Sequence, residues 1–439
     1  MSVPATEYRR RRERLMELML PGSLAIIPGG SRKIRNRDVE YTFRQDSDFY
    51  YLTGFNEADA LLVLVPGRSH GQAILFCQDH DPRFEAYHGE RLGPDRAVEA
   101  LGVDDAFPVP DLGDILPGLL EGRERIYMTL GDHSDLDRRI LRWVGDIRGR
   151  ESGGAIAPGE FVALKHMLHE LRLFKSAREL DLMRKAASIT VAAHERVMRV
   201  CRPGMTELGL EAELLHEFMQ RGARSPAYPS IVAAGRNACT LHYTDNCAAL
   251  KKGELVLIDA GCEYEYYASD VTRTFPVDGK FKGAQRALYE LVLDAQHAAI
   301  ECCVVGQHFN APNDAALRVM VQGLVDLKLL KGRVDDIIEK QAYTRFCPHK
   351  ASHWLGLDVH DVGDYRLGGE WRELEPGMVP TVEPGLYIRD DDANAGIPAR
   401  FRGIGIRIED DVLVTKSGSE VLTAAAAKTP AAIEALMVG

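Results

Sequence analysis

Acidic residues occur in this sequence where a buried strand should be apolar. The run Leu255-Val256-Leu257-Ile258 is typical of a strand buried on both faces, and Asp259 follows it directly. An unpaired carboxylate in such a place is costly or becomes protonated. Asp270 lies in the segment 267–275, whose β-branched and aromatic residues also predict a strand. A hairpin that turns within 262–266 would bring both acids together, and two adjacent carboxylates stay charged only around a cation.

The same anomaly occurs twice more towards the C-terminus. Glu383 ends a largely apolar run and precedes a Pro-Gly turn. In 403–409, isoleucines alternate strictly with Gly405, Arg407 and Glu409, so these three residues share one strand face. We expect Gly405 to leave room there for a ligand, although Glu409 could simply pair with Arg407.

Histidines supply a second type of metal ligand. His349, His353 and His360 lie close together in the sequence, and His242 lies further upstream. The four-residue spacing of His349 and His353 invites comparison with the zinc-protease helix motif. Lys350 stands where that motif needs its catalytic glutamate, so that interpretation is rejected.

Each of these residues alone has an ordinary explanation, such as a salt-bridged strand aspartate or a hydrogen-bonded structural histidine. Together, four carboxylates and one imidazole suit two hard or borderline divalent ions that share bridging carboxylates. The order of the five residues on strand-like segments is Asp259, Asp270, His353, Glu383 and Glu409.

We expect two domains, because 439 residues exceed one ordinary core. The first part alternates short apolar runs with helix-favouring stretches, which predicts an α/β unit. We expect its strands at 24–28, 61–65, 73–76 and 126–128, and helical segments at 96–101 and 134–144. We place the boundary so that the domains span 1–172 and 173–439.

Helices open the second part, and strands follow. Ser176 and Glu179 have the spacing of a capping box, and the helix that they begin ends at Pro203-Gly204. A second helix is expected over 206–221. Strands and tight loops follow to about residue 417, and the alanine-rich tail 424–427 predicts a terminal helix.

Bulk composition narrows the class of protein. A net charge of −11 argues against nucleic acid as the main partner. Eight cysteines without a C-x-x-C pair favour reduced thiols and a cytoplasmic location. Arg9 to Arg12 leave no apolar signal core after Met1, and the apolar run 61–65 is too short to span a bilayer, so no membrane association is expected.

In these local contexts, the five-residue order resembles the metallopeptidases of the pita-bread fold, and within them the aminopeptidase P branch. The resemblance covers nearly the whole chain and implies an α/β N-terminal domain followed by an α+β pita-bread catalytic domain, as in creatinase and methionine aminopeptidase. Its motifs are 40–55, 257–261, 269–273, 352–363, 381–387 and 403–411.

The resemblance also implies a ligand set. Asp259 would bind one metal ion, Asp270 and Glu409 would bridge two ions, and His353 and Glu383 would complete the second. Two divalent ions are therefore expected, with Mn²⁺ usual for this branch. Zn²⁺, Co²⁺ or iron fit the ligands nearly as well.

The activity implied is the release of the first residue from peptides with proline second, by a hydroxide that bridges two metal ions. Glu383 would transfer the proton, His360 would stabilise the oxyanion and His242 would contact the substrate at or after the cut. The proline side would be lined by His349, Tyr387 and Arg407. The resemblance further implies peptide substrates and a homodimer or homotetramer.

Two departures and three alternatives accompany this interpretation. Lys350 occupies a place where the family usually has glycine, and Arg402 a place that is often aromatic. A prolidase, which cleaves dipeptides ending in proline, would use the same metals, but 352–360 looks more like the aminopeptidase branch. Creatinase lacks metal, and pita-bread binding modules have lost their ligands, whereas all five positions here carry competent ligands.

Overall fold

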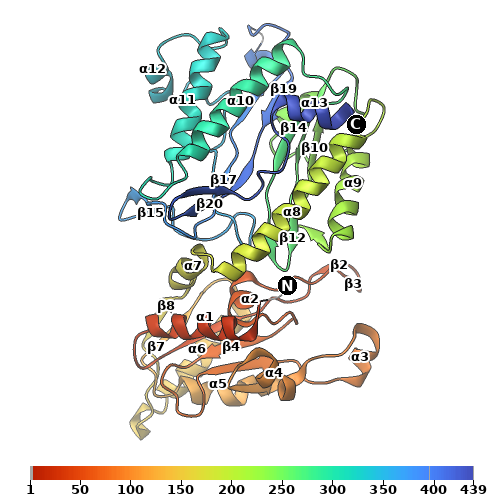
Figure 1. The fold of residues 1–439 in the computed structure, drawn as a ribbon. Helices are drawn as coiled ribbons and strands as arrows, with labels where there is room; N and C mark the ends of the chain where they lie inside the picture. Colours follow the sequence, from red (N-terminus) through yellow and green to blue (C-terminus); the bar gives the residue numbers. More distant parts are fainter. Residues whose placement is uncertain (1–2, 395, 439) are drawn as a thin grey trace. The chain divides into compact units, whose positions relative to one another are not determined.

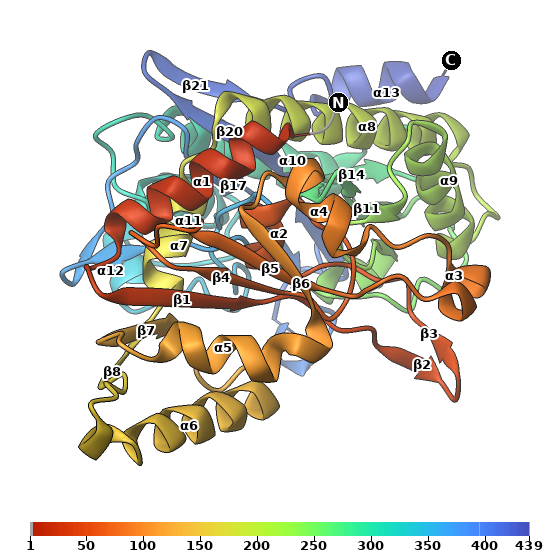
Figure 2. The same ribbon diagram turned by 90° about the horizontal axis from the view of Figure 1, so that it is seen from below.

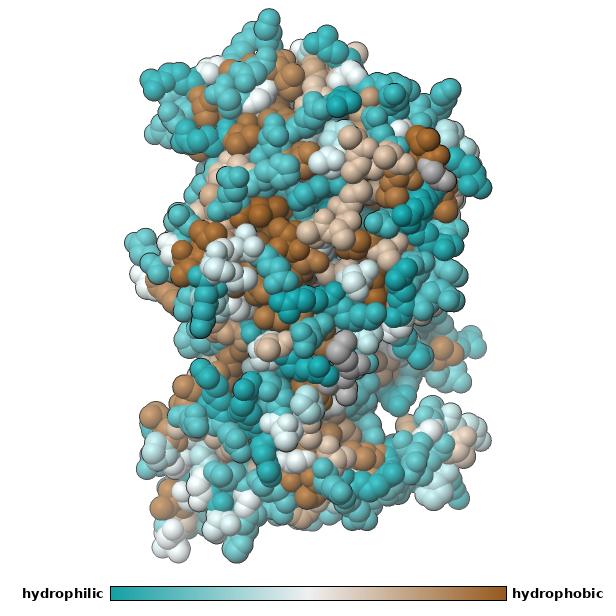
Figure 3. Space-filling view, viewed as in Figure 1, coloured by the Kyte–Doolittle hydropathy of each residue, from teal (hydrophilic) through white to brown (hydrophobic). Residues whose placement is uncertain are grey.

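The computed structural model describes residues 3–394 and 396–438. The chain divides into two compact units, Met1–Arg172 and Leu173–Gly439. Among the described residues, no helix combines the length and the apolar composition that a bilayer crossing requires. Polar side chains cover much of the face seen in Figure 3, and hydrophobic ones gather in scattered patches between them.

The first unit contains a six-stranded mixed sheet with the order β6-β5-β4-β1-β7-β8. Alternate residues such as Ile26, Val63 and Phe76 point to one face, where they pack against Leu116 and Ile140. Figure 2 shows helices α5 and α6 along that face and α1 and α2 on the other. The strands are β1 Ser23–Pro28, β4 Leu61–Leu64, β5 Ala73–Cys77, β6 Asp105–Pro108, β7 Arg125–Met128 and β8 Glu160–Ala163.

The remaining elements of this unit are helices and one small hairpin. Asp46 caps α2 and Asp81 caps α3 by accepting from first-turn amides. The four expected strands are confirmed, and the two expected helical segments belong to α4 and α6. The bounds are α1 Ala5–Leu18, β2 Ile34–Asn36, β3 Val39–Glu40, α2 Ser47–Thr53, α3 Pro82–His88, α4 Gly93–Leu101, η1 Val109–Asp111, α5 Leu112–Leu120, α6 Ser134–Arg148, η2 Glu151–Gly153 and α7 Lys165–Leu173.

The second unit opens with the helix pair α8 Ala177–Val200 and α9 Glu207–Gln220. The predicted capping box is confirmed, because Ser176 accepts from the Glu179 amide and Glu179 accepts from the Ser176 amide. Figure 1 shows this pair and the pair α10 and α11 flanking the strands. The further helices are η3 Gly235–Cys239, α10 Gly283–Glu301, α11 Ala311–Asp326, α12 Val334–Glu339, η4 Asp392–Asn394 and α13 Pro430–Val438.

Short antiparallel strands form the other layer of this unit. Val232, Val256 and Ile406 belong to the core beneath the helices, whereas Ile231 and Leu257 belong to a separate cluster. This alternation gives the strands a second face on which other side chains can gather. The strands are β9 Ser225–Pro226, β10 Ile231–Ala234, β11 Leu255–Asp259, β12 Cys262–Tyr264, β13 Tyr267–Ala268, β14 Thr272–Pro276, β15 Arg366–Leu367, β16 Glu370–Trp371, β17 Thr381–Val382, β18 Gly385–Ile388, β19 Ile404–Arg407, β20 Asp410–Thr415 and β21 Gly418–Val421.

The alanine-rich tail departs from the expectation. Residues 424–426 form a turn and a bend, residue 427 is irregular, and the terminal helix α13 begins only at Pro430. The carbonyls of Ala426 and Ala427 accept from the buried Arg273 guanidinium at 3.1 and 3.2 Å. The prediction of a helix over 424–427 was wrong because these carbonyls bond to a side chain far away in the sequence.

Arg273 also joins β14 to β20 inside the core. Its guanidinium donates to Asp410 at 2.7 Å and to the Glu409 carbonyl at 2.6 Å, and both side chains of the ion pair are fully buried. Lys428 donates to the same Asp410 carboxylate at 2.7 Å. The interaction therefore fixes the two strands that bear Asp270 and Glu409 near their ends.

We expect Arg273→Met to lower the free energy of unfolding of the second unit by about 3–5 kcal/mol, because it breaks a buried ion pair. Urea denaturation followed by fluorescence in a Trp143→Phe background measures this, since Trp354 and Trp371 then report on the second unit. The control is Arg184→Met, which breaks a half-exposed pair with Glu420 and should cost about 1 kcal/mol or less. Equal losses in the two variants would contradict the structural role of Arg273.

Candidate metal centre and active site

A hairpin brings the first two acids together. β11 pairs with β14 so that Asp259 lies opposite Thr272. The chain between them turns at Glu265 and Tyr266, which both have positive φ, as a tight two-residue hairpin turn requires. Asp259 ends β11 and Asp270 precedes β14, so both carboxylates lie at the same end of the strand pair.

Tyr228 shows how close these carboxylates are. Its hydroxyl lies 2.6 Å from Asp259 Oδ1 and also bonds to Asp270 Oδ1. A hydroxyl has one proton to donate, so it satisfies only one carboxylate at a time. The second carboxylate therefore needs a proton or a cation.

Two further strand segments bring the remaining acids to this place. The Glu409 amide donates to the Thr272 carbonyl at 3.0 Å, and its carboxylate accepts from the Thr272 hydroxyl at 2.7 Å. The Glu383 amide donates to the Ala351 carbonyl at 2.9 Å. Backbone pairing thus holds Glu409 beside the hairpin and Glu383 beside the histidine segment.

His353 faces the acids with its Nε2 atom. Its Nδ1 lies 2.9 Å from the Trp354 carbonyl, to which only an N–H can donate. Nε2 lies 3.4 Å from Asp270 Oδ2 and 3.5 Å from Glu383 Oε1, and it would present a lone pair to a cation that displaces its proton. This is the tautomer that a metal-binding histidine needs.

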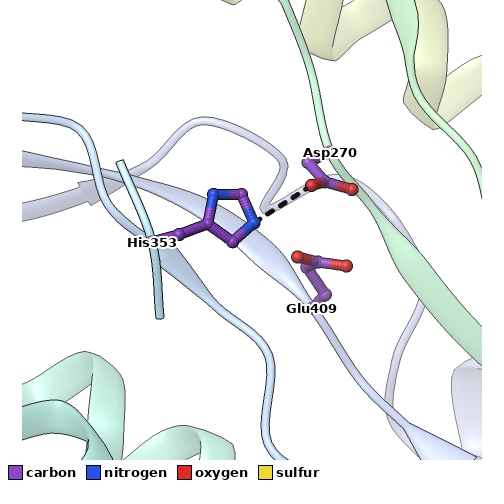
Figure 4. Close-up of side chains that lie close together, drawn as sticks. All are labelled: Asp270, His353 and Glu409. Atoms are coloured by element: carbon purple, nitrogen blue, oxygen red, sulfur yellow. Dashed lines mark ion pairs between the residues drawn. The ribbon is translucent and has the colours of Figure 1, made fainter. Parts of the chain in front are cut away.

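Three of these side chains form a compact donor cluster. One ligand atom from each of Asp270, His353 and Glu409 lies within 4.8 Å of the others. Figure 4 shows the three side chains converging from different segments of the second unit. Asp259 and Glu383 line the same cavity, so the structure brings together all five residues that the sequence predicted as ligands.

Without cations, this cluster takes up protons. Burial raises the pKa of Glu383 to about 7, and burial together with Asp270 raises the pKa of Glu409 well above its usual value. Burial disfavours a charged His353 ring, yet Asp270 and Glu383 raise its pKa to about 9. Divalent cations could replace these protons, and the oxygen-rich donor set with one imidazole fits hard or borderline ions.

The donors open into a cavity of about 430 Å³. Tyr387, which the sequence predicted at the proline side, is not in its wall, and neither is Gly405. The lining residues that matter here are His242, Asp259, Asp270, His349, Lys350, His353, His360, Glu383, Arg407 and Glu409. A larger cavity of about 670 Å³ borders η3 and contains none of these ligands, so volume alone does not identify the site.

Arg407, Tyr387 and His349 form a hydrogen-bonded chain behind the donors. Arg407 donates to Asp259 at 2.6 Å and to the Tyr387 hydroxyl at 2.7 Å. Tyr387 then bonds His349 Nε2 at 2.9 Å, and His349 Nδ1 donates to the Lys350 carbonyl at 2.8 Å. Burial lowers the pKa of His349 to about 4, so the ring that accepts from Tyr387 is neutral.

Two exposed histidines complete the wall. The His360 ring lies edge-on to His353, with the ring centroids 4.5 Å apart. Burial and the nearby His353 lower the pKa of His360. His242 belongs to the segment that follows η3.

Gly405 serves a different purpose from the one predicted. A Cβ at this position would lie 2.2 Å from the Ala238 carbonyl oxygen and 2.9 Å from the Cys239 amide nitrogen. The backbone of η3 therefore fills the space that we expected a ligand to occupy.

Sequence reasoning missed two residues of the site. Tyr228 bridges two acids, but its local sequence carries no signal for that role. Asp411 accepts from the Ser269 hydroxyl at 2.9 Å and from the Asp270 amide at 3.2 Å. Three consecutive acids, Glu409, Asp410 and Asp411, at the start of a strand were a signal that could have drawn attention to it.

Comparison with known proteins defines the class. Residues 181–416 match the model of metallopeptidase family M24, and residues 8–127 match the aminopeptidase P N-terminal domain. The chain therefore belongs to the M24 metallopeptidases. The predicted fold, an α/β N-terminal domain followed by a pita-bread catalytic domain, is confirmed.

The names of individual relatives are more specific than the name of the family. The Xaa-Pro aminopeptidase of Escherichia coli K12 is 47% identical over 433 residues, which cover 98% of this chain and 97% of the relative. The Haemophilus influenzae Xaa-Pro aminopeptidase is 46% identical over 435 residues, covering 99% and 98%. The structure of the Pseudomonas aeruginosa aminopeptidase PepP matches with a TM-score of 0.97 and 56% identity, covering 100% of this chain and 98% of that one.

We expect Asp270→Asn to lose metal from both positions, because the variant removes a charged group that lies within reach of several donors. Elemental analysis of the purified protein after dialysis against Mn²⁺ measures the change. The matched control is Asp364→Asn, which changes an exposed aspartate of the same unit outside the cavity wall. Full metal content in Asp270→Asn would contradict its place in the centre.

Proposed function

We propose that this protein is a metal-dependent aminopeptidase that releases the first residue of peptides with proline in the second position. The observation that carries the proposal is the convergence of five metal-competent side chains on one cavity. It is supported by membership of a metallopeptidase family and by relatives called Xaa-Pro aminopeptidase along nearly their whole length.

The catalytic domain in this proposal is 173–439, and 1–172 is the N-terminal domain. All residues of the cavity wall lie in the second unit, which supports the division. We further propose a cytoplasmic homodimer or homotetramer.

Two divalent ions would be held by the five predicted ligands, with Asp270 and Glu409 as the bridging carboxylates. Both carboxylates lie within reach of His353 in the compact donor cluster. Mn²⁺ is our first choice, with Zn²⁺ and Co²⁺ as alternatives; a zinc-substituted E. coli aminopeptidase P has been solved with its product. When bound, the ions supply an activated water and polarise the peptide carbonyl.

Glu383 moves the proton in this mechanism. It accepts the proton of the attacking water and passes it to the nitrogen of the departing proline, which must be protonated to leave. Its position in the cavity wall, 3.5 Å from His353 Nε2, places its carboxylate among the donors.

The two exposed histidines act on the substrate. His360 donates an N–H to the carbonyl oxygen as negative charge develops there. Its contact with His353 supports this role, because it places the imidazole beside the donors. His242 contacts the scissile amide or the residue after it.

His349 and Arg407 line the side that receives proline, and Tyr387 joins the two from behind the wall by hydrogen bonds. Proline has no amide hydrogen and a fixed φ, so proteases that clamp an extended backbone bind it poorly. A wall already fixed by internal hydrogen bonds suits such a rigid residue. Arg407 is almost fully buried, and its guanidinium donates hydrogen bonds to Asp259, Tyr387 and Thr272. Its role is therefore to keep this part of the wall in position.

The nearest alternative is a prolidase, and peptide length separates the two. We expect the metal-loaded protein to hydrolyse Ala-Pro-Ala and to leave Gly-Pro and Ala-Ala-Ala nearly untouched. Removal of metal by a chelator should abolish the activity and added Mn²⁺ should restore it. Efficient cleavage of Gly-Pro alone would establish the prolidase, and full activity in the demetallated protein would refute a metal-dependent reaction.

We expect Glu383→Gln to keep the fold and some metal but to lower kcat by about 10²–10⁴-fold, because it removes the proton acceptor. Steady-state kinetics on Ala-Pro-Ala, with circular dichroism and metal analysis, measure this. The matched control is Glu375→Gln, an exposed glutamate in the same unit that should keep the native rate. A near-native kcat in Glu383→Gln would remove Glu383 from the proton-transfer role.

A further inference from the structure

The cavity wall contains two basic side chains with permanent charge, Arg407 and Lys350. Arg407 is committed, because its guanidinium donates to Asp259 at 2.6 Å. Lys350 is exposed, and in the described parts of the chain no carboxylate oxygen lies within the 4.0 Å of an ion pair. One cation of the wall is therefore available to something that enters the cavity.

Hydrogen bonds fix the backbone position of Lys350. Its carbonyl accepts from His349 Nδ1 at 2.8 Å. The next residue, Ala351, donates its amide to Asn313 at 3.1 Å and accepts from the Glu383 amide at 2.9 Å. Hydrogen bonds to residues of the cavity wall thus fix the backbone at Lys350, whereas the Lys350 side chain is exposed to solvent.

An aromatic ring steadies the other end of the side chain. Lys350 Nζ lies 4.8 Å from the centroid of the Trp371 ring, and Arg366 Cζ lies 3.9 Å from the same centroid. A cation–π contact attracts the ammonium but leaves its three N–H donors for other acceptors. Lys350 therefore keeps its charge and its donors at the edge of the cavity wall.

The carboxylates of the centre do not neutralise Lys350. The carboxylates of Asp259, Asp270, Glu383 and Glu409 match two divalent ions, and Arg407 pairs with Asp259. A substrate of an aminopeptidase carries a positive amino group at its first residue, which Lys350 would repel. The part of the substrate that faces Lys350 must therefore be the other part, which begins with proline.

We propose that Lys350 is a specificity-determining residue that binds a carboxylate on the leaving part of the substrate. This inference rests on the proposed function. Lys350 directly follows His349, which lies on the side assigned to proline. The carboxylate has two possible sources, the C-terminus of a tripeptide or an acidic side chain in the third residue, and both offer the same chemistry to an ammonium group.

Four peptides and four proteins test the proposal. The peptides are Ala-Pro-Ala amide, Ala-Pro-Ala with a free C-terminus, Ala-Pro-Asp amide, and Glu-Pro-Ala amide with its carboxylate on the first residue. The proteins are the metal-loaded native chain, Lys350→Met, Lys350→Arg and the control Lys416→Met. Lys416 is exposed in the turn between β20 and β21, so its loss changes the net charge equally.

The readout is the ratio of kcat/KM for each carboxylate peptide to that for Ala-Pro-Ala amide, taken within each protein at low ionic strength. A general loss of rate cancels in this ratio. We expect Lys350→Met to lower the ratio by about threefold to fivefold, the size of an exposed charge pair. Lys350→Arg and Lys416→Met should keep the native ratio, and salt should reduce it in the native chain.

The outcomes are distinct. A fall for the free C-terminus, for Ala-Pro-Asp amide or for both supports the proposal and identifies the source of the carboxylate. An unchanged ratio in Lys350→Met, an equal fall in Lys416→Met, or a fall confined to Glu-Pro-Ala amide overturns it. If the native chain hydrolyses none of the peptides, the proposed function itself fails, which is a separate result.

Discussion

Four largely buried carboxylates that face one another around one cavity impose the constraint on which the rest of this structure depends. The chain supplies Arg407 for Asp259 and His353 for Asp270, and the hydroxyl of Tyr228 serves two acids with a single proton. These partners are too few to keep all four carboxylates ionised, and the pKa values of Glu383 and Glu409 are therefore raised. Such a cluster persists in a folded protein when cations or protons lie within it, so this arrangement of carboxylates suits the cavity to bind metal.

Three consecutive acids where β20 begins point in different directions and have different partners. Glu409 faces the cavity, Asp410 pairs with Arg273 in the core, and Asp411 holds the Asp270 amide. Side chains alternate along a strand, so one short run can serve the centre and the interior at once. The position of the donors is thereby tied to the fully buried ion pair of Arg273 and Asp410.

Local patterns predicted much of this from the sequence. An apolar run identified β11, reciprocal capping identified the start of α8, and acids after apolar runs identified the donors. Contacts between distant segments could not be predicted in this way. Tyr228 and Asp270 are 42 positions apart, and no local pattern predicts the hydrogen bond between them. Alanine content predicted a helix over 424–427, but the distant Arg273 takes the carbonyls there.

The close approach of Gly405 to η3 links two sides of the cavity. β19 bears Arg407, and it touches the backbone of Ala238 and Cys239 at the one residue without a side chain. Any larger residue at 405 would push η3 outward, and His242 follows η3 after only two residues. The position of His242 relative to Arg407 therefore depends on the absence of a side chain at position 405.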